Sequence, residues 1–429
     1  MKPQSDWHPV RCLAKFGSVI WLRWSRSLFL NAPLMSGSAE HSVSSPAKRI
    51  PSLDGLRAVS ISGVLLAHAT TGLASGAGLH EIGERTGALG VLFFFVISGY
   101  LITMLLRREA LRNGRISLVG FYRRRVLRIF PAFYSYLAVI AGLSAAGVLA
   151  ISRAELAAAA LHVWNYGGLW LDGTTDGGWF LGHFWTLALE EQFYLLWPLT
   201  VVAVGLNRAA AVAVAVCLTA PVLRVVCYAL FPQARGLTMM MLPTGADAIM
   251  IGCVVALVEG DPRFERRIRA LVSPMGAAGA LAVLLLVSTP LTIALRGAYS
   301  LPLGRSIDAL CVVVIVLSMI RHPACAVGRA LNSRPLVHVG VLSYSLYLWQ
   351  QLFLTSLNTT WSGRLPWSLA CAYLAALASY LLIERPFLAL KKRGKRAADA
   401  VRGEPVKDTG VVFSDERRGA AAESVTTAG

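Results

Sequence analysis

Runs of about twenty apolar residues, separated by short segments rich in arginine, are the feature that most constrains this chain. A helix needs about 20 such residues to cross the hydrocarbon core of a bilayer, where backbone polar groups must be satisfied within the protein. The sequence therefore predicts an all-α, polytopic membrane protein with about ten transmembrane helices. The runs occur at residues 56–74, 88–106, 130–149, 186–206, 209–231, 240–258, 275–294, 303–320, 336–357 and 367–387.

Composition and charge support a membrane protein. The 429 residues are 55% hydrophobic and only 15% charged, whereas soluble domains contain about 25% charged residues. The formal net charge of +18 comes largely from Lys and Arg clusters that follow the second, sixth, eighth and tenth apolar runs. With ten crossings, these clusters and both termini all lie on the cytoplasmic side. We therefore expect the lipid bilayer, and no nucleic acid, as the partner of this charge.

The chain ends and the cysteines are less informative. Residues 1–48 mix Trp and Leu with Arg, which favours an N-terminal extension and linker that contacts the membrane surface. The alternative is that Met35 is the true start. Residues 49–390 form the predicted membrane domain, and residues 391–429 a basic segment followed by a disordered cytoplasmic tail. The seven cysteines lie mostly in apolar runs without a CxxC pair, so we expect no disulfide framework and no metal site.

Two polar residues in the first apolar run are candidates for function. Arg57 and His68 are eleven residues apart, so on an α-helix they share one face and are separated by about 16 Å of rise. Ionisable side chains within a membrane are costly and usually functional. By the predicted orientation, Arg57 lies at the cytoplasmic mouth and His68 lies deeper, in the outer half of the membrane.

A pair of arginines stands where the cytoplasm meets the third run. Arg125 and Arg128 are three residues apart and therefore share a helical face. Pairs of guanidinium groups suit phosphates, which they hold through two parallel hydrogen bonds. The alternative is that this basic loop only sets the topology or contacts anionic lipid headgroups.

Two adjacent carboxylates, Glu190 and Glu191, open the fourth run from the outer side. A carboxylate near His68 would orient the imidazole ring and make it an effective base. The sequence does not say which of the two glutamates acts, and Asp247 and Asp308 are further acids within apolar runs.

These three features together predict a route for an acyl thioester. Its nucleotide end would stay on a phosphate site in the cytoplasm, while its acyl group would reach a histidine base deeper in the membrane. The alternative is a non-enzymatic transporter or flippase of a glycolipid, with a proton relay through His68. Such transporters often contain repeated halves, and the runs that carry His68 and the two glutamates have no counterparts in the second half.

Six motifs resemble the acyltransferase type 3 family, bacterial polytopic membrane enzymes that O-acylate carbohydrates and some secondary metabolites. The motifs occur in family order between about residues 50 and 390. They are Leu53-Asp54-Gly55-Leu56-Arg57 with ten residues between Arg57 and His68, Phe94-Phe95-Val96-Ile97-Ser98-Gly99-Tyr100, Arg125-x-x-Arg128, Glu190-Glu191-Gln192-Phe193-Tyr194, Ser343-Tyr344-Ser345-Leu346-Tyr347-Leu348-Trp349 and Ile383-Glu384-Arg385-Pro386-Phe387.

The resemblance implies an O-acyltransferase of the bacterial cytoplasmic (inner) membrane. Its donor would be acyl-coenzyme A, usually acetyl-coenzyme A, and its acceptor a hydroxyl of a carbohydrate or glycoconjugate. Direct transfer and transfer through an acyl-enzyme both remain open, as do the acceptor's identity and the oligomeric state. The implied roles are a catalytic base for His68, its motif partner for Arg57, membership of the site for Glu190 or Glu191, and phosphate binding for Arg125 and Arg128.

One position departs from the family pattern. Many relatives follow the Leu-Tyr-Leu-Trp motif with histidine, whereas this chain has Gln350-Gln351. We therefore expect no catalytic role for that position and assign more of the chemistry to His68. Some relatives also carry an extracytoplasmic hydrolase-like domain, for which the short tail leaves no room. We therefore expect the membrane domain alone to acylate the acceptor.

Overall fold

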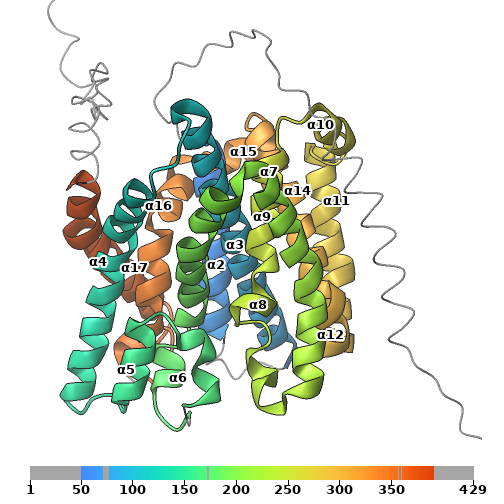
Figure 1. The fold of residues 1–429 in the computed structure, drawn as a ribbon. Coiled ribbons are helices and arrows are strands. Elements are labelled where there is room, and N and C mark those ends of the chain that lie inside the picture. Colours follow the sequence, from blue (N-terminus) through green and yellow to red (C-terminus); the bar gives the residue numbers. More distant parts are fainter. Residues whose placement is uncertain (1–49, 71–76, 172, 356, 359, 391–429) are drawn as a thin grey trace, which may run out of the picture.

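The computed structural model describes residues 50–70, 77–171, 173–355, 357–358 and 360–390 as a bundle of helices (Figure 1). The regular elements within these ranges are helical, so the predicted all-α fold is confirmed. The extension at 1–48 and the tail at 391–429 lie outside the described residues. The helices that form the bundle are α2 (Leu53–Thr70), α3 (Ala77–Asn113), α4 (Leu118–Ala145), α7 (Phe184–Leu230), α8 (Leu242–Gly245), α9 (Asp247–Val258), α11 (Pro274–Ala282), α12 (Thr289–Leu295), α14 (Arg305–Arg321), α16 (Arg334–Trp349) and α17 (Trp367–Ser379).

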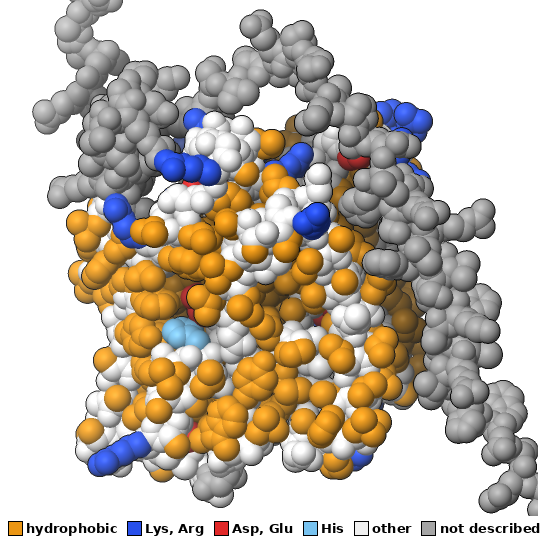
Figure 2. All heavy atoms as spheres, in the orientation of Figure 1, with side chains coloured by type: hydrophobic (Ala, Val, Ile, Leu, Met, Phe, Trp, Pro, Cys, Tyr) orange, Lys and Arg blue, Asp and Glu red, His pale blue; other side chains and the backbone are white. Residues whose placement is uncertain are grey.

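Six of the described helical segments are long and apolar enough to cross a membrane. Figure 2 shows hydrophobic side chains across the middle of one face of the bundle and Lys and Arg side chains towards its ends. This distribution is expected when lipid surrounds the middle of a helical bundle. The six segments are Glu81–Asn113, Leu118–Ala145, Phe184–Leu230, Pro274–Leu295, Gly297–Arg321 and Trp367–Leu390.

Helix α7 contains two of the expected apolar runs in one continuous element. A straight helix of its 47 residues would be about 70 Å long, more than twice the thickness of the hydrocarbon core. The chain avoids this length by breaking at Gly205, whose φ of 78° and ψ of 162° are not helical. Glycine adopts a positive φ without a steric penalty. The two halves therefore turn at the upper end of the bundle (Figure 1).

Helix α2 packs closely between α3 and α16. A Cβ atom on Gly90 of α3 would lie 2.4 Å from the Ser60 carbonyl oxygen, and one on Gly340 of α16 would lie 1.8 Å from the Asp54 carbonyl oxygen. Only glycine permits backbones to approach so closely, and such contacts are common between membrane helices. The close packing holds the helix that carries Arg57 and His68 in a defined position.

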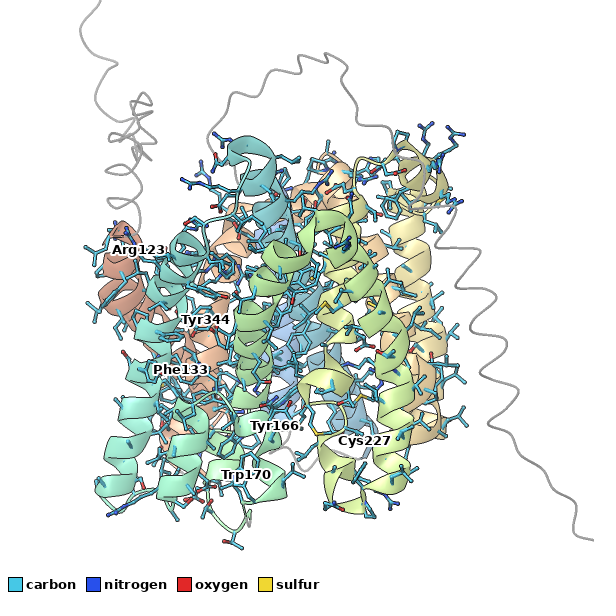
Figure 3. All side chains as sticks on the ribbon, in the orientation of Figure 1. Arg123, Phe133, Tyr166, Trp170, Cys227 and Tyr344 are labelled. Atoms are coloured by element: carbon cyan, nitrogen blue, oxygen red, sulfur yellow. The ribbon has the colours of Figure 1, made fainter. Side chains whose placement is uncertain are left out.

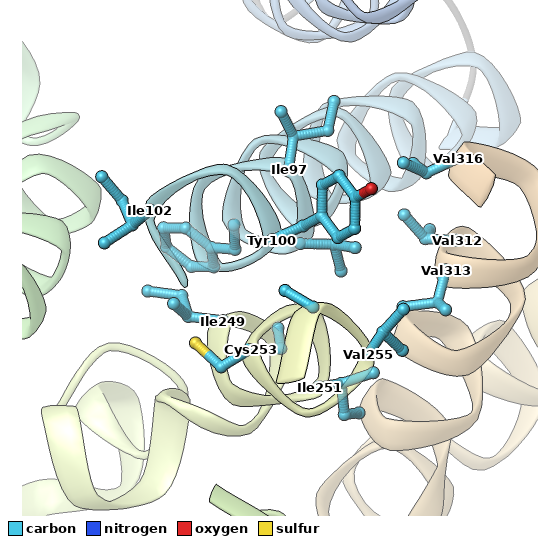
Figure 4. Close-up of a cluster of buried hydrophobic side chains, with 14 of the residues drawn as sticks. Ile97, Tyr100, Ile102, Ile249, Ile251, Cys253, Val255, Val312, Val313 and Val316 are labelled. Carbon is cyan, nitrogen blue, oxygen red and sulfur yellow. The ribbon is translucent and has the colours of Figure 1, made fainter. Parts of the chain in front are cut away.

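Helices α3, α9 and α14 pack around a dense apolar cluster (Figure 4). Figure 4 shows Ile97 and Tyr100 from α3 beside Ile249 and Val312 from the two other helices. At Gly99, a Cβ atom would lie 1.9 Å from the carbonyl oxygen of Ile249. The sequence motif that contains Gly99 therefore allows close approach of two helices.

The segment between α4 and α7 folds over one end of the bundle, opposite α10 (Pro262–Ile268) and α15 (Ala326–Leu331) (Figure 1). It contains α5 (Arg153–Ala160), η1 (Trp164–Leu169) and α6 (Gly177–Phe180). The eight residues of α5 span only about 12 Å, so this stretch does not cross a membrane. Glu155 is 2% exposed and accepts hydrogen bonds from Ser152 and Thr175, which ties the segment together.

Candidate active site

Five elements bring the charged residues of the sequence motifs into one cavity. Helix α2 contributes Arg57, α3 contributes Ser98, and α4, α7 and α16 contribute the remaining polar side chains. Figure 3 shows that Tyr344, which lines the cavity, lies between Arg123 at the upper end and Phe133 nearer the folded end segment. The cavity is thus deep in the bundle. Its polar lining consists of Arg57, Ser98, Arg125, Arg128, Thr186, Glu190, Glu191, Tyr194, Ser343, Tyr344 and Tyr347.

Glu190 is held by two hydroxyl groups. The Oγ atom of Ser98 donates to one carboxylate oxygen at 2.9 Å, and the Tyr194 hydroxyl lies 3.3 Å from the other. Tyr194 also donates to Ser98 Oγ at 3.1 Å, which closes a small network. Glu190 and Tyr194 lie four residues apart on α7 and therefore face the same way. The carboxylate is oriented before any ligand binds.

Two of the three arginines of the cavity interact with these carboxylates. Arg57 and Arg125 both interact electrostatically with Glu190, and Arg125 also interacts with Glu191. The guanidinium carbon of Arg125 lies 4.8 Å from the centre of the Tyr194 ring, a cation–π contact that fixes its position. Three arginines and two glutamates thus line the cavity.

The last sequence motif contributes another acid beside the arginines. Glu384 is buried and accepts a hydrogen bond from Ser345 Oγ of α16. It interacts electrostatically with Arg128 and Arg57. The Ile383–Phe387 motif thus places a carboxylate near Arg57 and Arg128, a role that its sequence alone did not suggest.

His68 lies apart from this group of charges. Its Nδ1 atom is 2.7 Å from the side-chain oxygen of Gln350, at the start of η5 (Gln350–Leu352). The edge of the imidazole also contacts Trp179 of α6, with the ring centres 5.5 Å apart. His68 is not among the residues that line the cavity.

Between the cavity and His68 stands a hydrogen-bonded group from α7 and α16. Thr186 and Tyr347, which both line the cavity, share a hydrogen bond of 2.6 Å. The Tyr347 hydroxyl donates to the carbonyl of His183 at 3.1 Å, and the rings of these two residues are in edge contact. The His183 ring in turn interacts electrostatically with His68.

The structure thus brings together Arg57, the arginine pair and the glutamate pair, but not in the arrangement expected for Glu190 and Glu191. We expected the carboxylates to face His68, whereas they lie with the arginines. Glu190 is six residues into α7 from its first residue, about 9 Å along the axis, which is far enough to reach the arginines. Opposite charges pair strongly in a medium of low dielectric constant.

Several residues at the site escaped the sequence prediction. Ser98 was named only as part of a motif, and no catalytic role was expected at Gln350. The four-residue spacing of Glu190 and Tyr194 predicts that their side chains share one face of a helix. No sequence signal marks His183 or Trp179 as neighbours of His68, because the elements that bring them there are far apart in the chain.

The two intramembrane aspartates have other partners. Asp247 pairs with Arg224 at 2.9 Å, and both side chains are fully buried. Asp308 pairs with Arg85 at 2.7 Å. A buried charge is stable only when it is paired and hydrogen-bonded, so these two pairs neutralise charges between helices in the second half of the bundle. Neither aspartate takes the position beside His68 that was considered for it.

The helical bundle and its charged internal cavity define an integral membrane protein with a buried polar site. The chain belongs to the acyltransferase type 3 family, because residues 50–385 match the family model described as an acyltransferase domain. The resemblance that the six motifs indicate is thereby confirmed.

Curated relatives agree with this membership. The chain is 26% identical over 370 residues to O-acetyltransferase OatA of Staphylococcus aureus, an alignment that covers 81% of this chain and 58% of the relative. It is also 26% identical over 395 residues to the peptidoglycan O-acetyltransferase OatA of Listeria monocytogenes, with 81% and 56% covered. The chain therefore spans less than two thirds of the length of these relatives. No solved structure matches it.

Proposed function

We propose that this protein is an O-acyltransferase of the bacterial inner membrane that moves an acetyl group from acetyl-coenzyme A to a hydroxyl of a carbohydrate or glycoconjugate. The observation that carries the proposal is the cavity in which Arg57, Arg125 and Arg128 meet the glutamate pair, on the same bundle that holds His68. The names of the relatives, O-acetyltransferase and peptidoglycan O-acetyltransferase, support acetyl as the acyl group and a cell-wall polysaccharide as one acceptor class.

The donor would bind through its phosphates to the arginines of the cavity. Guanidinium groups hold phosphates through paired hydrogen bonds, and Arg125 is already fixed against the Tyr194 ring. The three arginines that line the cavity provide the positive charge that an anionic ligand needs. The acyl end would then extend past Thr186 and Tyr347 towards His68.

His68 would act as the general base. It takes the proton of the acceptor hydroxyl while the hydroxyl oxygen attacks the carbonyl carbon of the thioester. The C–S bond breaks, and the thiolate of coenzyme A leaves and takes up a proton. The same base also serves a two-step route in which an enzyme side chain carries the acyl group, so this proposal covers both routes.

We also propose ten crossings with both ends of the chain in the cytoplasm. The segments that support this count are α2, α3, α4, the two halves of α7, α8 with α9, α11 with α12, α14, α16 and α17. The arginines at the ends of α3 and α14 and in α10 and α15 would then share the cytoplasmic side. A transporter is disfavoured because the chain belongs to an enzyme family.

The experiment is acyl transfer from labelled acetyl-coenzyme A in membranes that contain the wild type or His68→Ala. The matched control is His338→Ala. His338 is exposed, and within the described residues its ring shares a hydrogen bond with the Tyr373 hydroxyl. We expect His68→Ala to abolish labelling of the acceptor and His338→Ala to retain it. Equal labelling by all three proteins would refute the assignment of His68.

A second measurement addresses the donor site. Arg125→Ala combined with Arg128→Ala should raise the KM for acetyl-coenzyme A. An unchanged KM would remove these arginines from the donor site. Chemical comparison of surface glycans from cells with and without the gene would identify the acceptor.

A further inference from the structure

Gln350 is the residue of this chain that departs from the family motif, and the structure gives it a definite place. Its side chain is 0% exposed and its amide oxygen lies 2.7 Å from Nδ1 of His68. The residue ends α16 and begins η5, so its backbone is fixed by two regular elements. A buried amide at hydrogen-bond distance from an imidazole restricts the positions of the ring protons.

We propose that Gln350 is a positioning residue that selects the tautomer of His68 with its proton on Nδ1, an inference that rests on the proposed function. An amide oxygen has lone pairs and no proton, so it only accepts hydrogen bonds. Nδ1 of His68 must therefore donate. In a neutral imidazole the lone pair then resides on Nε2, which is the atom that takes the proton of the acceptor hydroxyl.

Trp179 sets the orientation of the same ring. Its indole meets the His68 imidazole edge-on, at an interplanar angle of 66°, and its Nε1 atom donates to the backbone carbonyl of Gln351 at 3.0 Å. The η5 turn therefore holds both partners of His68, one through the Gln350 side chain and the other through the Gln351 carbonyl. Gln350 thus fixes the tautomer of the imidazole, and Trp179 fixes the orientation of its ring.

The amide is neutral, which distinguishes it from the carboxylate that most commonly supports a catalytic histidine. A carboxylate stabilises the charged imidazolium, whereas an amide oxygen does so only weakly. The proposed base therefore stays neutral, and able to accept a proton, at lower pH than a histidine beside a carboxylate.

The titratable groups around His68 come from several elements. His183, which precedes α7, interacts with it electrostatically, and Tyr347 of α16 contacts His183. On α3, Glu81 and Glu84 are exposed. Arg85 of α3 is paired with Asp308, and Asp176 beside α6 accepts a hydrogen bond from the Ala150 N–H. A change at position 350 alters the partner of Nδ1 and leaves these groups in place.

The test is the pH dependence of kcat/KM for acyl transfer by the full-length protein in membranes. Gln350→Glu keeps an acceptor beside Nδ1 but adds a negative charge. It should remain active at alkaline pH, with the acidic limb of the profile shifted upward by about one pH unit because the carboxylate stabilises the imidazolium. Gln350→Met keeps the shape but removes the acceptor, and should lower kcat about tenfold or more while the KM for acetyl-coenzyme A stays unchanged.

The control is Gln233→Glu, which makes the same chemical change at an exposed glutamine in η2 (Pro232–Leu237). Its pH profile should match that of the wild type. An unshifted profile for Gln350→Glu, or its inactivity at every pH while the protein is present in the membrane at wild-type amounts, would overturn the role of Gln350. The proposed function fails separately, if His68→Ala retains acyl transfer. If Gln350→Met does not accumulate, the profile of Gln350→Glu alone decides.

Discussion

The hydroxyl of Ser98 offers the most specific test of the cavity. Ser98→Ala removes the 2.9 Å hydrogen bond to Glu190 and leaves only the longer 3.3 Å contact from Tyr194. A hydrogen bond to a charged group contributes about 1.5–3 kcal/mol. Without it, the carboxylate is free to turn towards Arg57 and Arg125, which already attract it. It then competes with the donor phosphates for these arginines.

The expected effect of Ser98→Ala is therefore on the donor. The lower end of that range, about 1.5 kcal/mol, corresponds to a change in affinity of slightly more than tenfold. The KM for acetyl-coenzyme A should therefore rise about tenfold while kcat changes little. The assay is the initial rate of acyl transfer as a function of donor concentration in membranes.

The matched control for Ser98→Ala is Ser62→Ala. Ser62 is exposed on α2, and its hydroxyl donates only to the Ala58 carbonyl of its own helix among the hydrogen bonds of the described residues. If Ser98→Ala gives the same donor KM as Ser62→Ala, the hydroxyl does not restrain Glu190, and the link between the carboxylate and the donor site is wrong.

Three further predictions concern stability. Gly340→Ala places a Cβ atom 1.8 Å from the Asp54 carbonyl oxygen, and overpacking of this kind typically costs about 1–3 kcal/mol, so the Tm in detergent should fall. Arg224→Leu removes the closest charged partner of the buried Asp247 carboxylate and leaves Arg305 at 3.6 Å; a loss of about 3–5 kcal/mol should sharply reduce the folded protein recovered. Burial alone would raise the pKa of Glu265, but hydrogen bonds from Arg321 and from a backbone N–H lower it below its ordinary value. The lowered pKa stabilises the fold above the ordinary carboxyl range, and this stability is lost as pH falls through the lowered value, so Glu265→Gln should reduce the dependence of Tm on pH below about 5.

Each of these predictions has a direct check. Gly279→Ala is the control for the first, because a Cβ atom at Gly279 meets no atom within 4 Å; equal Tm values for the two variants would contradict the close packing of α2. For the second, Arg224→Leu combined with Asp247→Leu should recover part of the protein, and no recovery would mean that the lost ion pair of Asp247 is not the cause. For the third, unchanged acid sensitivity of Glu265→Gln would exclude the pair with Arg321.

The helices were predictable because lipid imposes a simple rule on sequence. Long apolar runs report directly on helices that contact lipid, and the outer helices such as α4 and α17 follow that rule. The interior helices obey it less well, since α2 and α16 carry polar residues that other helices surround. The break at Gly205 lies near the end of the expected run 186–206, just before the polar pair Asn207 and Arg208 that separates it from the next run.

The internal geometry of the site was less predictable. Arg57 and Glu190 were identified because a charged side chain within a membrane is energetically costly and usually functional, and because both lie in family motifs. Their pairing depends on how α2 and α7 are placed around the cavity, which the pattern of residues along the sequence does not encode. Gln350 was missed for a different reason: a neutral amide is less costly to bury than a charge, and the role of Gln350 follows only from its distance to Nδ1 of His68.

The anchoring of the end segment has an evolutionary consequence under the proposed function. The cavity is built from α2, α3, α4, α7 and α16, whereas Trp179, which contacts His68, belongs to the separate segment tied together by Glu155. Under that function, the arginines of the cavity and part of the surroundings of His68 therefore lie in different segments of the sequence. Substitutions at Trp179 alter the surroundings of the proposed base and leave the arginines of the cavity in place, so enzymes that share a donor site can differ beside the base.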